Sequence, residues 1–315
     1  MMDAFQFTLL AGAAAFVFVL ALTPAFASFL KGRGIIGRDV NKDKKPAVAE
    51  MGGAIVVFAF LAAHLAYSFI FQSVLSPLFY PILLIALFGA ADYFLHFKPR
   101  HKLIVPLLAS VLALPAVSQS MHTPFGVLYL GSFAYALFVV SFTAIPNLTN
   151  MLAGFNGLEA GLGAVMTFSL AAVAFFMLEP AAFFSSFILF TALLAFLFYN
   201  KYPARVFPGD VLTMSIGAVL TLTAFRSGLE LYLFVLLLPH FSDAALKFWS
   251  AGIMSREGRA PLKMVRGKLR MPKGGYMSLA RVFVSRNALD EKELVAKLIN
   301  IELILSLVTI FLGLV

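Results

Sequence analysis

Residues 145–161 have the sequence Ile-Pro-Asn-Leu-Thr-Asn-Met-Leu-Ala-Gly-Phe-Asn-Gly-Leu-Glu-Ala-Gly, in which amides and glycines interrupt an otherwise apolar region. The runs that contain and follow this stretch, 131–152 and 158–177, are mostly apolar. A helix needs about 20 such residues to cross a bilayer, whose core offers no water to an unpaired backbone amide. We therefore predict two membrane helices joined by a short polar turn.

Further apolar runs on both sides of this hairpin extend the pattern along the chain. The 315 residues are 61% hydrophobic and 12% charged, whereas soluble domains carry about 25% charged residues. Asp290 followed by Glu293 matches the capping-box pattern that begins a helix, here the last one. We predict an all-α integral membrane protein with about ten transmembrane helices in a single domain, 1–315. The expected spans are 5–30, 52–74, 76–97, 103–119, 131–152, 158–177, 180–199, 210–227, 229–252 and 293–315.

The basic residues are distributed unequally between the two sides of this membrane domain. Of the 24 lysines and arginines, 23 fall in alternate connections and only Arg226 falls on the other side. Because Lys and Arg accumulate in cytoplasmic loops, these connections are assigned to the cytoplasm. They are 31–50, 98–102, 200–209 and 247–297, and the last contains a long loop, 253–289. The net charge of +9 follows from this topology, so we expect no nucleic-acid partner.

Polar side chains that could carry chemistry gather at the cytoplasmic ends of the predicted spans. The chain has no cysteine, which excludes disulfides and thiolate metal sites. Ionisable groups at membrane depth are costly and usually face a functional cavity. Carboxylate and amide oxygens suit a hard cation such as Mg²⁺, which often bridges protein and phosphate oxygens. The candidates are Glu50, Asp92, Asn147, Asn150, Asn156, Glu159, Asp210 and Asp243.

The segment 145–161 resembles a motif of the polyprenyl-phosphate N-acetylhexosamine-1-phosphate transferases of glycosyltransferase family 4, in the form of the dolichyl-phosphate N-acetylglucosamine-phosphotransferase branch. Further matches occur in the same order as in the family. They are Asp39–Gly53, Gly89–Asp92 followed by Arg100–Lys102, and Val206–Asp210. The resemblance covers most of the chain. It implies a ten-helix membrane enzyme that uses Mg²⁺ to transfer a sugar 1-phosphate from a UDP-sugar to a polyprenyl phosphate.

The same resemblance implies roles for individual residues. Asp210 would ligate Mg²⁺, or Mn²⁺ in its place, on the UDP-sugar pyrophosphate, with Asn156 as a second ligand. The catalytic residues would be Asp92, Lys102 and Asp210, with Lys102 in contact with phosphate. The substrate-binding residues would be Glu50, Asn150, Gly154, Asn156, Gly157, Arg256 and Arg259.

Two features separate this chain from parts of the family. The family's acidic motif has paired aspartates, whereas Asp92 is followed here by Tyr93, so the coupled titration of two adjacent carboxylates is not available. His96, three residues further on, is open to either a substrate contact or a helix-end role. Residues 253–289 contain no histidine, unlike the muramyl-peptide and undecaprenyl branches, which favours the dolichol-type branch.

The resemblance therefore predicts transfer of N-acetylglucosamine 1-phosphate from UDP-N-acetylglucosamine to dolichyl phosphate, with release of UMP. This is the first step of lipid-linked oligosaccharide synthesis for protein N-glycosylation, on the cytoplasmic face of a prokaryotic or archaeal plasma membrane or of the endoplasmic reticulum. Another UDP-sugar, or undecaprenyl phosphate for cell-envelope polysaccharide, would use the same chemistry. Two further alternatives are a family member with a decayed site and a ten-span ion-coupled transporter using Asp92, Asp210 and Asp243. A homodimer is compatible with each.

Overall fold

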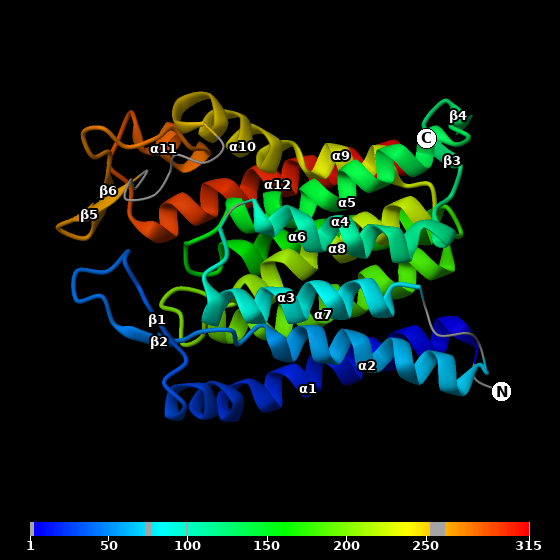
Figure 1. Cartoon of the computed structure of the whole chain (residues 1–315), viewed down its shortest axis with the longest axis horizontal. Helices are drawn as coiled ribbons and strands as arrows, with labels where there is room; N and C mark the ends of the chain where they lie inside the picture. Colours follow the sequence, from blue (N-terminus) through cyan, green and yellow to red (C-terminus); the bar gives the residue numbers. More distant parts are fainter. Residues whose placement is uncertain (1–2, 73–76, 99, 253–261, 315) are drawn as a thin grey trace.

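The computed structural model describes residues 3–72, 77–98, 100–252 and 262–314 and shows a bundle of roughly parallel helices (Figure 1). This confirms the helical membrane class. The helices are α1 (Ala4–Gly32), α2 (Ala54–Ile70), α3 (Phe79–Leu95), α4 (His101–Ala113), α5 (Phe133–Met151), α6 (Leu158–Phe176), α7 (Pro180–Asn200), α8 (Asp210–Arg226), α9 (Glu230–Leu236), α10 (Leu238–Ala251), α11 (Leu279–Val284) and α12 (Glu291–Leu314). A 3₁₀ turn, Leu114–Ala116, extends α4.

Three small hairpins lie at the two ends of the bundle. Strands β1 and β2 and strands β5 and β6 lie at one end with α11, whereas β3, β4 and both termini lie at the other (Figure 1). Each pair is antiparallel. The termini therefore share a side, as an even number of crossings requires. The strands are β1 (Ile36–Arg38), β2 (Ala47–Ala49), β3 (Ser120–Thr123), β4 (Gly126–Tyr129), β5 (Lys263–Val265) and β6 (Lys268–Arg270).

Fewer helices than expected have the length and hydropathy of a complete membrane span. Among the described residues, five helices qualify, namely α1, α5, α6, α7 and α12. Three apolar helices, α2, α3 and α4, are shorter, and α8 has 17 residues. The described structure therefore supports five or six spans by this criterion, and the number ten stays a prediction.

The expected span 229–252 is not a single helix. It is divided into α9 and α10, which meet at a bend of 59°. Pro239 lies in the first turn of α10. Proline has no amide hydrogen and its ring clashes with the preceding turn, so a continuous helix cannot pass through this position undisturbed. The pair counts as the sixth span if it crosses the membrane as one broken unit.

Helix α8 forms the centre of the bundle. Every residue from Val211 to Phe225 is buried, and α8 packs against α2, α3, α5, α6, α7 and α9. The hydroxyls of Ser215 and Thr221 bond within the helix, to the carbonyls of Val211 at 2.6 Å and Gly217 at 2.7 Å. The helix therefore carries its polar first residue, Asp210, at a fixed position at the end that also holds β1 and β2.

Two glycines permit the close helix contacts that fix this position. A Cβ on Gly89 of α3 would lie 2.6 Å from the amide nitrogen of Val211, and one on Gly217 of α8 would lie 2.8 Å from the carbonyl of Ile145 in α5. Small residues allow membrane helices to approach at their backbones. Helices α3 and α5 are thereby held directly against α8, near Asp210.

The last helix begins where the sequence predicts. Asp290 Oδ1 accepts a hydrogen bond from the Glu293 amide at 2.8 Å, and Glu293 Oε2 accepts one from the Asp290 amide at 2.9 Å. This reciprocal pair satisfies two amides that the first helical turn leaves unpaired. The capping box is confirmed, and it places the neighbouring Glu291 in the first turn of α12.

Candidate active site

Three predicted catalytic residues meet at one end of the bundle, although each comes from a different helix. Lys102 Nζ, at the start of α4, donates to Asp92 Oδ2 at 2.7 Å and to Asp210 Oδ2 at 2.7 Å. Asp92 lies near the end of α3, where it also accepts from the amide of Phe97 at 2.9 Å. One ammonium therefore bridges two carboxylates that come from different helices.

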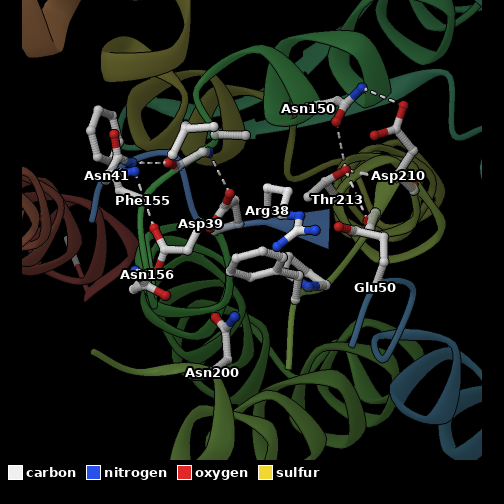
Figure 2. Close-up of a pocket in the computed structure, with 17 residues that line it drawn as sticks. Arg38, Asp39, Asn41, Glu50, Asn150, Phe155, Asn156, Asn200, Asp210 and Thr213 are labelled. Atoms are coloured by element: carbon white, nitrogen blue, oxygen red, sulfur yellow. Dashed lines mark hydrogen bonds between the residues drawn. The ribbon is translucent and has the colours of Figure 1, made fainter. Parts of the chain in front are cut away.

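The amide of Asn150 links this cluster to the 145–161 segment. Asn150 Nδ2 donates to Asp210 Oδ2 at 3.0 Å, and its Oδ1 accepts from the Thr213 hydroxyl at 2.8 Å. Both the lysine and the amide therefore bond to Oδ2 of Asp210. The other carboxylate oxygen remains directed toward the neighbouring cavity, where Figure 2 shows Asn150, Thr213 and Asp210 grouped together.

A tight turn holds Glu50 beside Asp210. The amide of Phe207 donates to the Ala49 carbonyl at 2.8 Å, and the Gly52 amide donates to the Phe207 carbonyl at 2.9 Å. Gly209 has a φ of +68°, and a Cβ there would lie 2.9 Å from the Cα of Met51. Only glycine fits this backbone without strain. Backbone hydrogen bonds thus fix the Val206–Asp210 turn to the segment that carries Glu50.

Burial changes the acidity of Glu50, which lies between β2 and α2. Burial, with a smaller contribution from the nearby Asp210 carboxylate, raises the pKa of Glu50 to about 7 against the lowering effect of a hydrogen bond from the Met51 amide. The side chain therefore changes charge close to neutral pH.

The glycine-rich turn after α5 is fixed by one buried carboxylate, Glu159, and one side-chain amide, Asn41. The Gly154 amide donates to Glu159 Oε1 at 2.6 Å, and the Gly154 carbonyl accepts from Asn41 Nδ2 at 2.6 Å. Gly154 has a φ of +100° and Gly157 a φ of +82°, which side chains with a Cβ rarely adopt. The turn therefore needs glycine at both positions, and Glu159 serves to hold it.

Asn156 is held by residues from two distant parts of the chain. Its side-chain amide donates to Asp39 Oδ2 at 2.9 Å and to Glu291 Oε1 at 2.8 Å, and its Oδ1 accepts from the Ala204 amide at 3.1 Å. Glu291 also pairs with Lys42. Asn156 lies on the opposite side of the cavity from Asp210 in Figure 2. The amide beside Asp210 is that of Asn150.

Two adjoining cavities share the central residues of the site. The larger, of about 440 Å³, lies between the β1–β2 segment and the turn that follows α5. The smaller, of about 290 Å³, is lined by Asp92, Tyr93 and His96. Glu50, Gly209 and Asp210 line both. Asp210 therefore faces two chambers at their junction.

The charge of the larger cavity bears on which ligands it can take. Its walls carry the carboxylates Asp39, Glu50, Glu159 and Asp210 and one guanidinium, Arg38. An anionic ligand would need a cation there to offset this charge. The described residues contain no group of three or more His, Asp or Glu arranged to hold a metal by themselves. Mg²⁺ commonly takes one or two carboxylates and completes its shell with phosphate and water, so the residues present fit an ion shared with a ligand.

Several other residues predicted from the sequence make contacts that hold parts of the structure together. Tyr93 Oη accepts a hydrogen bond from the Ile36 amide at 3.1 Å, so the residue in place of a second aspartate tethers α3 to β1. Asn147 Nδ2 donates to the Lys102 carbonyl at 3.1 Å. Asp243 pairs with Lys247 at 2.6 Å, away from both cavities. Arg256 and Arg259 lie outside the described residues.

Sequence reasoning did not single out Asp39, Asn41 or Glu291 as site residues. Asp39 and Asn41 lie in the segment Asp39–Gly53, and its match to the family could have identified them. No feature of the sequence pointed to Glu291 except its position after Asp290. Its contacts with Asn156 and Lys42 join positions far apart in the chain.

The chain is a helical membrane bundle with a two-chambered polar site at one end, and similarity to known proteins gives its class, a transferase, and its family. Residues 75–228 match the family model described as Glycosyl transferase family 4. A Methanocaldococcus jannaschii protein provisionally named a glycosyltransferase is 34% identical over 286 residues, covering 89% of this chain and 88% of that protein. The chain belongs to glycosyl transferase family 4, in the group of polyprenyl-phosphate hexosamine-1-phosphate transferases.

Two other relatives carry more specific names. A Sulfolobus acidocaldarius protein provisionally named UDP-N-acetylglucosamine–dolichyl-phosphate N-acetylglucosaminephosphotransferase is 31% identical, over 74% of this chain and 75% of that protein. The phospho-N-acetylmuramoyl-pentapeptide-transferase of Streptococcus thermophilus is 27% identical, over 71% of this chain and 73% of that protein. The resemblance stated from the motifs is thereby confirmed at the level of the family.

Proposed function

We propose that this protein transfers N-acetylglucosamine 1-phosphate from UDP-N-acetylglucosamine to a polyprenyl phosphate of the dolichyl type and releases UMP. The observation that carries the proposal is the junction of two cavities at Glu50 and Asp210. The larger cavity has the size range of small-ligand sites and would take the UDP-sugar. The smaller, beside Asp92, would take the lipid phosphate. The names of the relatives from Sulfolobus and Streptococcus support this class of reaction.

The reaction needs positioning and charge neutralisation more than a strong base. An oxygen of the lipid phosphate attacks the β-phosphorus of the UDP-sugar, a new phosphorus–oxygen bond forms, and the bond from that phosphorus to the bridging oxygen breaks. UMP leaves with the bridging oxygen. A phosphate monoester has a second pKa of about 6 and is largely dianionic at neutral pH. Direct attack is therefore compatible with Tyr93 in place of a second aspartate.

The residues of the cluster each have a part in this arrangement. Lys102, held between Asp92 and Asp210, carries a positive charge at the junction where the two phosphates would meet. Asn150 fixes the orientation of the Asp210 carboxylate. The Gly154 turn brings backbone close to the larger cavity, where no side chain would obstruct a nucleotide. Such preorganised groups stabilise developing charge without rearrangement.

A divalent cation, Mg²⁺ or Mn²⁺, is part of the proposal. When bound, it would neutralise the pyrophosphate and polarise the reacting phosphorus. Asp210 would hold it through the carboxylate oxygen that neither Lys102 nor Asn150 contacts. We place Asn150 nearest to this ion. Asn156, predicted from the sequence as a second ligand, lies across the larger cavity from Asp210 and would instead lie beside the nucleotide.

The proposal includes the membrane setting and the pathway. The ten expected spans would cross the bilayer, and the site would face the cytoplasm because the basic loops gather at its end. The membrane would be a prokaryotic or archaeal plasma membrane or the endoplasmic reticulum. The product would begin lipid-linked oligosaccharide synthesis for N-glycosylation.

The test is an assay of purified protein in lipid nanodiscs with Mg²⁺. UDP-N-acetylglucosamine, UDP-N-acetylgalactosamine and UDP-N-acetylmuramoyl-pentapeptide are each paired with dolichyl or undecaprenyl phosphate. UMP release and the lipid-linked sugar are measured. We expect the highest turnover with UDP-N-acetylglucosamine and dolichyl phosphate. Faster turnover with the muramoyl donor would reassign the substrate, and no UMP from any pair, with folding verified, would contradict the proposal.

A further inference from the structure

A third cavity, larger than both chambers of the site, lies on another side of the bundle and belongs to no part of the proposed reaction. It has a volume of about 690 Å³ and lies between α6, α7 and α12. Its walls are apolar along most of its length, with Ala164, Phe168, Leu194, Ile299 and Leu303 among them. In a membrane, an apolar groove on the outside of a helix bundle faces hydrocarbon chains rather than water.

One end of this groove is strongly basic. Lys201, Tyr202 and Lys292 line it there. Lys292 Nζ lies 4.7 Å from the centre of the Tyr202 ring, and Lys42 Nζ lies 4.0 Å from the same centre. Among the described residues, no carboxylate lies within ion-pair distance of Lys201 or Lys292. The two ammonium groups at the mouth therefore carry charge that no carboxylate in the described parts of the chain neutralises.

The groove matches one leaflet of a bilayer in length and direction. It extends along α12 from Lys292 to Leu303, which at a rise of 1.5 Å per residue is ~16 Å. One leaflet of the hydrocarbon core is about 15 Å thick. Its basic mouth lies where α7 ends and α12 begins, at the end of the bundle that carries β1, β2, β5 and β6 (Figure 1). An occupant would thus have a polar head at this end and an apolar chain directed into the membrane.

We propose that this groove is a binding site for an anionic phospholipid, with the phosphate between Lys201 and Lys292 and an acyl chain along α6 and α12. Basic pockets between membrane helices on the cytoplasmic side are typical sites for anionic lipid headgroups. A zwitterionic lipid would bring its own positive charge to the two lysines and would bind less tightly.

The site is separate from the place where the lipid substrate would react. Lys102 and Asp92 lie on α4 and α3, which pack chiefly against one another, α5 and α8. The groove meets the larger polar cavity only through Asn156, which lines both. A phosphate at Lys201 would therefore lie behind the wall of the donor cavity. The proposal is independent of the sugar transferred.

The contacts around Tyr202 connect this groove to the wall of the active site. Lys42, which lies over the Tyr202 ring, also pairs with Asp39 and Glu291. Those two carboxylates bond the side chain of Asn156. A lipid phosphate at Lys292 would interact with the lysines gathered around Tyr202, namely Lys42 and Lys292. We therefore expect bound lipid to stabilise the folded protein.

The experiment measures lipid binding and stability rather than turnover. The protein is placed in phosphatidylcholine nanodiscs with increasing phosphatidylglycerol, its melting temperature is recorded, and bound lipid is counted by native mass spectrometry. The wild type should retain phosphatidylglycerol several-fold over phosphatidylcholine and melt higher by a few degrees. The variant Lys201→Gln with Lys292→Gln should lose both effects. Lys263→Gln with Lys268→Gln, an equal charge change on the exposed β5–β6 hairpin, should keep them.

A second variant tests the groove without changing its charge. Ala296 is exposed on α12 and lines the groove, so Ala296→Trp should fill it and remove phosphatidylglycerol retention while both lysines remain. Equal retention by the lysine pair and its control, or full retention by Ala296→Trp, would overturn the site. Displacement of phosphatidylglycerol by stoichiometric polyprenyl phosphate would also overturn it and assign the groove to the lipid substrate.

Discussion

Glu291 accepts two hydrogen bonds from Asn156 on the same oxygen, one from the backbone amide at 2.7 Å and one from the side-chain amide at 2.8 Å. The two residues are 135 positions apart in the chain, and Glu291 is 2% exposed. The first turn of α12 thereby holds the turn that follows α5. Because Asn156 lines the larger cavity, this contact sets the shape of the proposed donor site.

Replacing Glu291 with Gln should weaken donor binding more than chemistry. The charged acceptor and its pairing with Lys42 are lost, and a charge-assisted hydrogen bond is about twice as strong as a neutral one. We expect KM for the UDP-sugar to rise about tenfold, the equivalent of about 1.4 kcal/mol, with kcat changed little. Steady-state kinetics would show this. Asp43→Asn, which removes an exposed carboxylate from the same basic segment, is the control. A fall in kcat at unchanged KM would place Glu291 in the chemical step instead.

Replacing Asp210 with Asn should remove turnover while the fold remains. The amide keeps the volume of the side chain and can still accept from Lys102, but it carries no charge for a divalent cation. Loss of one well-placed electrostatic group typically costs 100- to 1,000-fold in kcat, and we expect at least about 100-fold here.

The comparison for that variant is Tyr93→Phe. It removes only the hydroxyl that accepts from the Ile36 amide, so its kcat should stay within about threefold of wild type because a neutral hydrogen bond contributes about 1 kcal/mol to stability. Near-normal kcat in Asp210→Asn would disprove the proposed cation ligand.

Replacing Lys102 with Met should lower both activity and stability. Asp92 and Asp210 would then face each other with no cation between them, because Lys102 now bonds both. Like charges at such short range are destabilising. The melting temperature should fall by several degrees.

Adding Asp92→Asn to that variant should recover stability without recovering turnover. The second substitution removes one of the two repelling carboxylates but restores no positive charge to the phosphates. A double-mutant cycle on melting temperature, with UMP release measured in parallel, separates the two effects. If the double variant melts as low as Lys102→Met alone, carboxylate repulsion is not the cause.

The stability of the protein should depend on Glu50 as pH passes through neutrality. Burial raises the pKa of Glu50 to about 7 from an unfolded value of 4.5. Between these values the folded state holds a proton that the unfolded state has released, so stability falls as pH rises from about 5 to about 7. Glu50→Gln should flatten the melting temperature over this range, and Asp43→Asn should not. An unchanged pH profile in Glu50→Gln would exclude this carboxyl as its source.

Removal of divalent ions should abolish turnover and leave the bundle folded. A chelator should stop UMP release, and Mg²⁺ or Mn²⁺ should restore it, because the four carboxylates around the larger cavity otherwise repel an anionic donor. The described residues contain no group of three or more His, Asp or Glu arranged to hold a metal by themselves, so circular dichroism should not change. Full turnover in the presence of chelator would rule out the divalent ion.

The sequence by itself determined the class of molecule and most of its helices. Long apolar runs can satisfy backbone amides in a membrane only as helices, and the quoted turns carry enough local pattern to indicate the family. The capping box at Asp290 could also be predicted from the sequence, because a cap depends on residues only three positions apart. Helix breaks were harder to see: Pro239 divides the expected ninth span, although hydropathy runs through it without interruption.

The tertiary structure alone decided how the site is assembled. The sequence indicated that Asp92, Lys102 and Asp210 matter, but only helix packing brings them together: α3 meets α8 at Gly89, and α4 packs against α3. Glu291 gave no signal of its role, since its partner Asn156 comes from a distant turn. Contacts of this kind depend on which helix faces which. That choice is made by the summed packing of the whole bundle, and no local pattern of residues records it.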